Sequence, residues 1–487
     1  MISGPQAVIC SVLIILANYN SCSLKAQAAA ASEDERYHFV RVSSQSPSRR
    51  CSSAPSVYES ENAGSANQQE GLRIVHRRGP CSPFGPADKA AAETTRQLIR
   101  LDQSRVDSLQ ARIWRTRQQQ MGVADLPAEL GTSLGTLNYI VTVGFGSPSR
   151  KLSLAFDTGS DVTWIQCKPC SPNSNSGGGC YTQQEPLFDP SQSTSYRDVS
   201  CTSSQCSQLK SGTGNPGTCS SSSTCQYMIG YGDGSTTSGS FAQETLTLTP
   251  NDIISNFYFG CGHDNQGLFG SAAGLLGLGR HPLSIVQQTS SKYNRAFSYC
   301  LPASSGSSGY LKIGSDAMSS SSSNVKFTQL EPGSNSFYFL DVTGIKVGGQ
   351  ELPPQVFANG GTIIDSGTVV SRLPPSAYAA LRSAFRQAMA NYTMAKEYEI
   401  FDTCYDFSGL ESVTLPKIVL RFAGDVEVDV DATGIILRAS ANQFCLAFAG
   451  NKYEDSVGII GNRQQRTYDI VYDVAGERVG FGAGGCS

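Results

Sequence analysis

The sequence predicts an all-β protein built from two related β lobes that face each other. From about Leu137 onward, short apolar runs of β type are broken by Gly, Pro and Ser. The segment Leu154–Ser160 (LAFDTGS) is echoed by Thr362–Thr368 (TIIDSGT), 208 residues later when Asp157 and Asp365 are compared. An apolar-apolar-Gly element follows each copy, at Leu275–Gly277 and Ile459–Gly461, and this repeated order indicates two domain-sized halves.

The N-terminal residues 1–28 have the pattern of a secretory signal peptide. The apolar run Ala7–Ala17 is too short to span a bilayer, and Ala26–Ala28 follows as a small-x-small cleavage site. The leading MISGPQ lacks Lys and Arg, which leaves a plastid transit peptide as the alternative. We therefore expect a secreted protein without a membrane anchor, and the chloroplast is the second candidate location.

Residues 29–124 are predicted to be a removable pro-segment, with a plain surface helix as the alternative for its second half. The polar, Ser-rich stretch 29–70 is expected to be disordered. Residues 88–118 carry apolar side chains at helical spacing and are expected to be a helix. Residues 70–117 hold 10 basic and 5 acidic side chains, whereas the body of the chain, residues 118–487, holds 22 basic and 30 acidic ones. The segment is therefore attracted to this acidic body.

The remainder divides into an N-terminal lobe, 137–318, and a C-terminal lobe, 325–487. A Ser-rich linker, Ser319–Ser323, separates them. One helix is clear in this part, Ser376–Met389, with Ser376 as its N-cap. Asn391 begins the chain's N-x-S/T sequon and is a candidate glycosylation site.

Cysteine usage favours an oxidising compartment. Twelve of the 16 Cys lie between Cys167 and Cys486, which permits six disulfides. Seven of them crowd into the Ser/Gly-rich insertion 167–225, which buries little apolar surface and needs cross-links to be ordered. The pair Cys167-x-x-Cys170 could instead bind zinc or act in redox chemistry. A zinc site would need a second such pair or two His at matching spacing, and neither is present, so no metal is expected.

The chemistry of the repeat follows from its two aspartates. Two carboxylates held close together cannot both ionise cheaply, so one keeps a proton, as in the aspartic-protease dyad. The ionised member can take a proton from water while the protonated member donates to a peptide carbonyl. Flanking groups suit this role: Gly159 and Gly367 permit a close approach of the loops. Hydroxyls of Thr158 and Ser366 could join the loops, and those of Ser160 and Thr368 could hold the carboxylates.

These motifs make residues 137–487 resemble a pepsin-type aspartic endopeptidase, and most closely the plant nepenthesin-like group. The resemblance implies a bilobal pepsin-like fold with a cleft between the lobes, and Asp157 and Asp365 as the catalytic pair. It implies that Tyr231 and Gly232 belong to a flap over the substrate, and that Trp164 hydrogen-bonds Tyr231. The second lobe has Asp-Ser-Gly in place of Asp-Thr-Gly, which keeps the hydroxyl, so activity is expected.

The resemblance extends to the Cys-rich insertion and to a disulfide between Cys404 and Cys445. It also links Val75–Ser82 to the pro-segments of a plant subgroup that includes apoplastic proteases and a plastid DNA-binding protease. It implies a precursor inhibited by its own pro-segment and active in acid. We expect pro-segment cations, among them Arg73, Arg77 and Arg78, to pair with the acidic body until acid protonates its carboxylates.

Two alternative functions are compatible with this resemblance. A non-catalytic inhibitor of glycosidases on the same fold is the first, because fold does not dictate function. Retention of both aspartates and of Tyr231 favours the enzyme. DNA binding is not favoured, because the basic stretch lies within the pro-segment. The expected partners are therefore protein or peptide substrates and the chain's own pro-segment, with no cofactor and a monomeric state.

Overall fold

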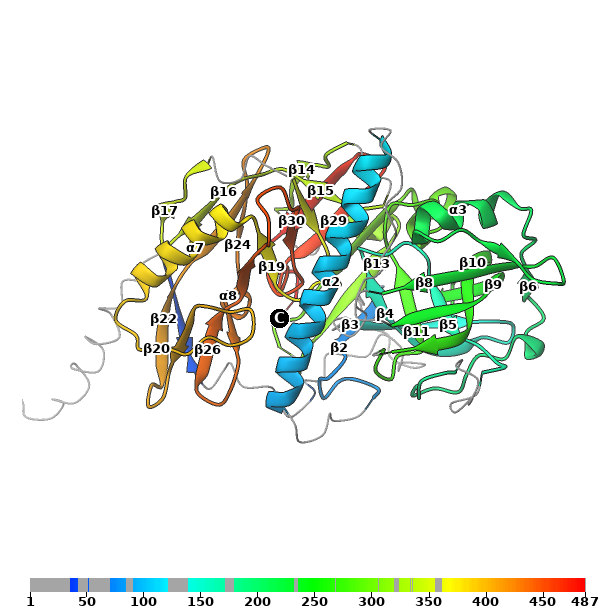
Figure 1. Cartoon of the computed structure of the whole chain (residues 1–487), viewed down its shortest axis with the longest axis horizontal. Coiled ribbons are helices and arrows are strands. Elements are labelled where there is room, and N and C mark those ends of the chain that lie inside the picture. Colours follow the sequence, from blue (N-terminus) through cyan, green and yellow to red (C-terminus); the bar gives the residue numbers. More distant parts are fainter. Residues whose placement is uncertain are drawn as a thin grey trace, which may run out of the picture.

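The computed structural model describes residues 36–42, 51, 71–84, 91–120, 139–170, 179–231, 235–267, 269–304, 306–318, 324–332, 334, 336–354 and 361–486. The predicted signal peptide and the linker Ser319–Ser323 lie outside these residues, as does Gly232 of the predicted flap. Two β-rich lobes lie side by side and one long helix crosses between them (Figure 1). This arrangement confirms the predicted all-β bilobal fold.

A 15-stranded sheet forms the N-terminal lobe and continues into the region where the lobes join. Its order is β14-β30-β29-β12-β13-β2-β3-β4-β11-β5-β10-β9-β8-β7, and β6 pairs with β9. The strand bounds are β2 Leu72–His76, β3 Tyr139–Phe145, β4 Arg150–Asp157, β5 Trp164–Gln166, β6 Arg197–Asp198, β7 Thr218–Cys219, β8 Cys225–Gly230, β9 Thr236–Thr249, β10 Asp252–Gln266, β11 Gly274–Gly277, β12 Ala296–Cys300, β13 Ser308–Ile313, β14 Lys326–Gln329, β29 Asp469–Asp473 and β30 Arg478–Gly482.

The C-terminal lobe contains three smaller sheets and part of a two-stranded one. Their orders are β15-β18-β28-β19-β27, β17-β16-β23-β24, β20-β21-β26-β25 and β1-β22. The strand bounds are β1 Tyr37–Arg41, β15 Phe339–Leu340, β16 Val342–Val347, β17 Gln350–Glu351, β18 Thr362–Ile364, β19 Ser371–Leu373, β20 Met394–Ala395, β21 Cys404–Asp406, β22 Ser412–Pro416, β23 Ile418–Phe422, β24 Val426–Asp429, β25 Ile436–Arg438, β26 Gln443–Leu446, β27 Phe448–Gly450 and β28 Gly458–Ile460.

The sequence repeat appears as a repeated strand arrangement. In the first lobe β11 pairs parallel with β4 and antiparallel with β5. In the second lobe β28 pairs parallel with β18 and antiparallel with β19. Each apolar-apolar-Gly element therefore lies beside the strand that leads into an aspartate, and Gly277 is in register with Asp157.

The helices are few and mostly short. Their bounds are α2 Ala91–Gln120, α3 Ser204–Thr213, α4 Ile285–Gln288, α5 Ser290–Tyr293, α6 Ser315–Met318, α7 Pro375–Ala388 and α8 Ala432–Ile435, with a 3₁₀ turn η2 at Pro190–Gln192. The predicted N-cap of α7 is wrong: the helix begins at Pro375, because proline suits the first helical position. Ser376 lies inside the first turn, where its hydroxyl donates to Glu454 Oε2 at 2.8 Å. No described helix is long and apolar enough to cross a membrane.

Two strands of the N-terminal segment pair with the body. β2 lies between β13 and β3 in the large sheet. The expectation of disorder over 29–70 is wrong for Tyr37–Arg41, which pairs antiparallel with β22 of the C-terminal lobe. Only Val40 of this strand is buried, so the sequence offered little apolar periodicity from which to predict it.

Seven disulfides are formed among the described cysteines. All twelve Cys from Cys167 to Cys486 are paired, as Cys167–Cys261, Cys170–Cys180, Cys201–Cys219, Cys206–Cys225, Cys300–Cys486 and Cys404–Cys445. Cys51–Cys81 joins two parts of the N-terminal segment. The pair Cys167-x-x-Cys170 is thus divided between two disulfides, so its sulfur atoms are not free thiolates.

Candidate active site

Asp157 and Asp365 lie on two loops that meet between the lobes. Asp157 ends β4 and Asp365 directly follows β18, and both side chains are fully buried. The loops are joined reciprocally: the Thr158 amide donates to Ser366 Oγ at 3.0 Å, and the Ser366 amide donates to Thr158 Oγ1 at 2.9 Å. These two bonds relate the loops by an approximate twofold symmetry.

Each carboxylate is held by groups of its own loop. The Gly159 amide donates to Asp157 Oδ1 at 3.0 Å, and the Ser160 hydroxyl donates to Asp157 Oδ2. The matching pair in the second lobe is the Gly367 amide to Asp365 Oδ1 at 3.0 Å and the Thr368 hydroxyl to Oδ2 at 2.5 Å. The loops therefore orient both carboxylates through short-range contacts that the repeat itself encodes.

Glycine is required in both loops by the close approach of the opposite carboxylate. A Cβ at Gly367 would lie 2.5 Å from Asp157 Oδ1, and a Cβ at Gly159 would lie 2.7 Å from Asp365 Oδ1. Both separations are shorter than any normal van der Waals contact, so a methyl group at either position would push the loops apart.

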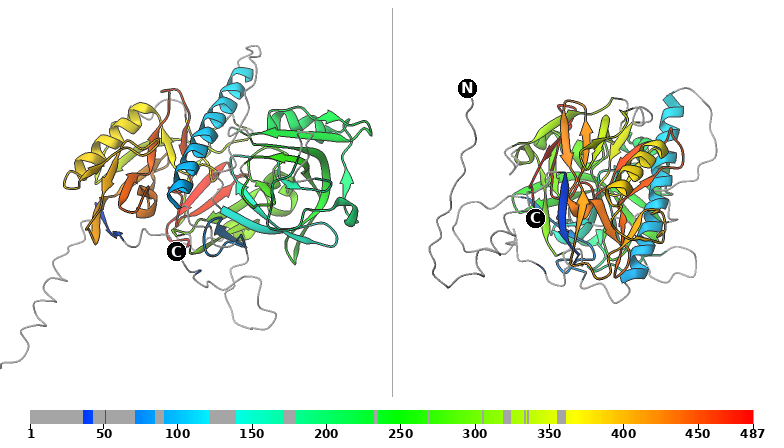
Figure 2. Two further views of the ribbon diagram at one scale, coloured as in Figure 1. Left: turned by 60° about the horizontal axis from the view of Figure 1, so that its bottom comes forward. Right: turned by 90° about the vertical axis from the view of Figure 1, so that its left-hand side faces the viewer.

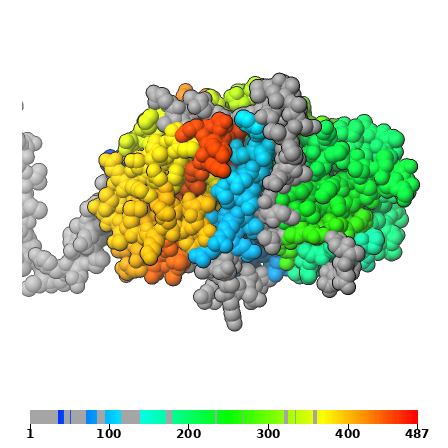
Figure 3. Space-filling view, in the orientation of Figure 1, coloured from blue at the N-terminus to red at the C-terminus, as the bar shows by residue number. Residues whose placement is uncertain are grey.

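Helix α2 lies along the junction of the lobes (Figures 2 and 3) and contacts the two aspartates. Its Arg105, which is fully buried, reaches both carboxylates. Arg105 Nη2 donates to Asp157 Oδ1 at 2.7 Å and to Asp365 Oδ1 at 2.9 Å, and Nε donates to Asp365 Oδ2 at 3.1 Å. One nitrogen atom thus contacts both acids, so they converge on the position where a substrate carbonyl and a water molecule would have to lie.

The environment separates the pKa values of the two acids. Burial raises the pKa of Asp365 to about 6, and the neighbouring charge of Asp157 acts in the same direction, although Arg105 opposes both. Burial also disfavours ionised Asp157, but Arg105 and the hydrogen bonds from Ser160 and Gly159 outweigh it and lower the pKa of Asp157. The two carboxylates raise the pKa of Arg105, which stays charged.

Further contacts hold α2 against both lobes. Toward the C-terminal lobe, Asp102 forms a buried ion pair with Arg372, at 2.9 Å. Toward the N-terminal lobe, Arg112 Nη2 contacts Asp161 Oδ2 at 2.7 Å. Its apolar side chains pack on both sides of the site, including Ile99 against Val369, Val370 and Phe401, and Val106, Leu109 and Ile113 against Phe337, Ile363 and Ile459.

Of the predicted flap residues, the structure describes Tyr231 and Trp164, which lie together in the buried cluster of the N-terminal lobe. Trp164 Nε1 donates to the Tyr231 hydroxyl at 2.7 Å, as the resemblance implied. Both rings pack against Phe269, with centroid separations of 5.0 Å for Trp164 and 5.9 Å for Tyr231. β8 and β9 lead into and out of this hairpin and pair Gly230 with Thr236.

The cation at the aspartate pair is a residue that the sequence reasoning missed. We expect Arg73, Arg77 and Arg78 to pair with the acidic body, whereas the cation that contacts the two carboxylates is Arg105. Arg77 is instead buried beside Gly270 in the N-terminal lobe. A usable signal existed, since Arg105 falls at a position of the helix's apolar face, one turn before Leu109.

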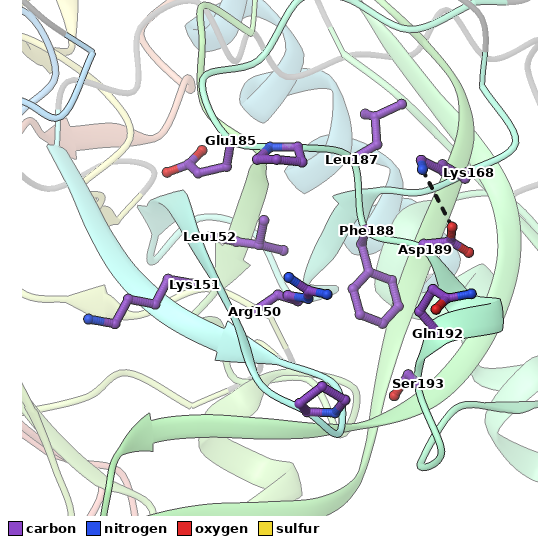
Figure 4. A pocket seen from close by; sticks show the side chains of 12 residues that line it. Arg150, Lys151, Leu152, Lys168, Glu185, Leu187, Phe188, Asp189, Gln192 and Ser193 are labelled. Carbon is purple, nitrogen blue, oxygen red and sulfur yellow. Dashed lines mark ion pairs between the residues drawn. The ribbon is translucent and has the colours of Figure 1, made fainter.

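A separate pocket of about 390 Å³ opens elsewhere in the N-terminal lobe and includes neither aspartate (Figure 4). It is lined by Arg150, Leu152, Glu185, Phe188 and neighbouring residues, and Lys168 pairs with Asp189 at 3.4 Å on its rim. Among the described residues no group of His, Cys, Asp and Glu side chains could hold a metal ion.

Comparison with known proteins adds the family. Residues 139–315 match a family model described as "Xylanase inhibitor N-terminal", and residues 337–483 match one described as "Xylanase inhibitor C-terminal". An aspartyl protease family protein of Arabidopsis thaliana is 46% identical over 458 residues, which cover 92% of this chain and 93% of the relative. Nepenthesin-2 of Nepenthes gracilis, an aspartic proteinase, is 33% identical over 80% of this chain and 85% of its own.

A solved structure shares the fold. Basic 7S globulin from soybean matches with a TM-score of 0.57 at 21% identity, covering 71% of this chain and 93% of that one. The identity and coverage of the curated relatives, together with the paired Asp-Thr/Ser-Gly loops, show that the chain belongs to the pepsin-type aspartic endopeptidases, in the plant nepenthesin-like group.

Proposed function

We propose that this chain is the precursor of a secreted aspartic endopeptidase that acts in acid on proteins or peptides. The convergence of Asp157 and Asp365 on one nitrogen of Arg105 carries the proposal. That nitrogen occupies the place where a reacting group would contact both acids. In this proposal α2 belongs to the pro-segment and blocks the site until it leaves.

Once α2 has left, the two acids have different roles. Asp157, which the Gly159 amide and the Ser160 hydroxyl hold in place, accepts a proton from the attacking water. Asp365 holds the proton that the pair keeps in acid and donates it to the substrate carbonyl oxygen. Water then attacks without a covalent intermediate, and the pair shares one proton throughout. The Ser160 and Thr368 hydroxyls keep the carboxylates oriented during the transfer.

The same pair makes the docking of α2 sensitive to pH. Arg105 lowers the pKa of Asp157 below its ordinary value, so Asp157 binds more protons once the helix has left. Its contribution to docking is therefore lost as the pH falls below about 4, the ordinary pKa of an aspartate. Asp102 and Asp365 act in the opposite sense, because burial raises the pKa of both in the docked state. We expect Asp157 to dominate, since the permanent charge of Arg105 lies against it.

Several features support secretion. Seven disulfides require an oxidising compartment to form and persist. Asn391 of the sequon is exposed and therefore accessible to glycosylation. The extracellular space of the plant is the location we favour, and the chloroplast is the alternative left by the N-terminal sequence.

A binding function without catalysis is the second candidate, because the matching family models are described as xylanase inhibitors. Both lobes keep a hydrogen-bonded aspartate loop, which inhibition by binding would not require. DNA binding by the mature form is disfavoured by the acidic body, and a salt-sensitive gel shift with that form would support it.

The deciding experiment uses the full chain, secreted and then acid-treated. Cleavage of a denatured protein substrate is followed from pH 2 to 6, with and without a transition-state analogue of peptide hydrolysis. Asp157→Asn and Asp365→Asn should each lower cleavage at least about a hundredfold. Asp252→Asn, at a surface ion pair with Lys292, is the matched control and should retain activity. Cleavage that is absent, or unaffected by the analogue and by both site variants, would overturn the proposal.

A further inference from the structure

A carboxylate-binding cluster lies beside the two aspartates, in the C-terminal lobe. The Asp102 carboxylate accepts from Arg372 Nη2 at 2.9 Å and from the Val369 amide at 2.6 Å. The Val370 amide adds a longer contact of 3.4 Å. Asp102 and Arg372 are both fully buried. A guanidinium and a backbone amide that converge on one carboxylate form a strong, charge-assisted arrangement.

The donors and the acceptor of this cluster belong to different parts of the molecule. Arg372 is the middle residue of β19, and Val369 directly follows the Asp365 loop, so the donors are part of the body. Asp102 is on α2, which the proposed function assigns to the pro-segment. The body therefore contains a site for a carboxylate, and in the precursor the pro-segment fills it.

Removal of α2 leaves Arg372 without its carboxylate partner. The two carboxylates that act most strongly on Arg372 are Asp102 and Asp107, both on α2, and the next group is the Tyr378 hydroxyl of α7. Arg372 Nη1 donates to the Val370 carbonyl at 3.1 Å, which restrains the guanidinium. Its Nε is buried and has no hydrogen-bond partner among the described residues. A restrained, charged guanidinium whose Nε–H can still donate a hydrogen bond suits a carboxylate from another molecule.

The position of the cluster relates it to the scissile bond. Asp102 precedes Arg105 by three residues, about 4.5 Å along the helix axis at 1.5 Å per residue. An extended substrate advances about 3.3 Å per residue. A substrate that crosses the aspartate pair in place of α2 therefore brings a side chain one or two residues from the cleaved bond close to Arg372.

We infer that the mature enzyme has a subsite selective for an acidic side chain, one or two residues from the scissile bond, formed by Arg372 and the Val369 amide. This inference rests on the proposed function and specifies its substrates. Asp102 is the internal occupant of this subsite in the precursor. A neutral side chain there would leave the guanidinium without an anion, which costs more than a missing apolar contact.

The test measures kcat/KM of the acid-activated protein on peptides that differ at a single position, scanned over two residues on each side of the cleaved bond. Cysteic acid is compared with Asn, because its sulfonate stays ionised at every assay pH. At one position the acidic peptide should be cleaved about tenfold or more faster, the range of a charge-assisted hydrogen bond. Arg372→Gln should bring this ratio close to one, while the control Arg421→Gln, in an exposed ion pair with Glu351, should leave it unchanged.

Outcomes separate this inference from the proposed function. If the wild-type protein gives a ratio of kcat/KM between the cysteic acid and Asn peptides near one at every position, and the transition-state analogue inhibits cleavage, the subsite is overturned. The proposed protease function is then unaffected. The subsite is also overturned if Arg372→Gln keeps the wild-type ratio. If Arg372→Gln is not secreted, because Asp102 then lacks its partner, Asp102→Asn with Arg372→Gln restores a neutral pair and gives the same readout. Absence of any inhibitor-sensitive cleavage instead defeats the proposed function.

Discussion

Replacement of Arg105 by Met should release the block on the precursor's active site. The side chain is fully buried and makes four hydrogen-bond contacts to the two aspartates. Methionine keeps much of the length and the apolar stem while removing the charge. The change therefore tests the cation itself, with little change in the packing of α2.

The expected magnitude follows from the burial of the ion pairs. Breaking a buried ion pair by removing one partner costs about 3–5 kcal/mol, because it leaves an uncompensated charge. Here part of that cost is recovered, since the pair can take up a proton and the pKa of Asp365 is already raised to about 6. We therefore expect a weakening of α2 docking by about 3 kcal/mol, which is about a hundredfold in the equilibrium between docked and released helix.

The assay uses the full-length precursor before any processing. Peptide cleavage is measured in the first minutes at pH 6, and amide hydrogen exchange of α2 is measured on the same sample. Both the initial rate and the exchange rate should rise about a hundredfold in Arg105→Met. The matched control is Arg100→Met on the same helix. Arg100 pairs with Glu399 at 3.0 Å but is 68% exposed, so its loss should cost at most about 1 kcal/mol.

Two results would refute this reasoning. Arg105→Met could remain as latent as the wild type, with unchanged exchange of α2, which would mean that apolar packing and the outer ion pairs hold the helix without the central cation. Arg100→Met could release the helix as strongly as Arg105→Met, which would mean that the exposed pair matters as much as the buried one.

Further predictions concern the site, the flap, a disulfide and pH. Gly367→Ala should abolish cleavage in a protein that is still secreted, because its Cβ would lie 2.5 Å from the opposite carboxylate; full activity would contradict the observed approach of the loops. Tyr231→Phe leaves the buried Trp164 indole N–H without its acceptor and should lower stability by about 1–2 kcal/mol in thermal unfolding, with a lower kcat/KM. Replacing Cys404 and Cys445 together by Ala opens a link between residues 41 apart and should cost about 4 kcal/mol in denaturant unfolding; a loss under 1 kcal/mol would argue against this pairing. Exchange of α2 amides in the wild-type precursor should accelerate as the pH falls below about 4, the ordinary pKa of an aspartate, because Arg105 lowers the pKa of Asp157 in the docked state; acceleration on raising the pH would contradict this sign.

Much of the candidate site could be predicted because its contacts are local. The amide of Gly159 binds a carboxylate two residues away, and Ser160 binds the same carboxylate from three residues away. The second loop repeats both contacts through Gly367 and Thr368. Such short-range bonds are encoded by neighbouring residues, so the two similar motifs indicated two similar loops before any fold was known.

The position of Arg105 and the disulfide pairing depend on contacts between segments that are far apart in the sequence. The segment 70–117 contains ten cations, and composition alone could not choose Arg105 among them. The choice arises because α2 turns one face toward the body, and the position one turn before Leu109 then falls over the aspartates. The disulfide partners of Cys167 and Cys170 likewise depend on the folded structure. The two residues do not pair with each other, because the fold brings a different cysteine next to each of them.

The sequence by itself determined the two aspartate loops, the repeated β architecture, the cysteine-rich character and the charge difference between segment and body. The tertiary structure alone decided that Arg105 lies between the two acids, that Asp102 fills a carboxylate site at Arg372, and that the two aspartates differ in pKa. The physical reason is the distance along the chain over which each interaction acts. Local hydrogen bonds and hydrophobic periodicity depend on neighbouring residues, whereas burial and ion pairing depend on groups that are brought together from distant parts of the chain.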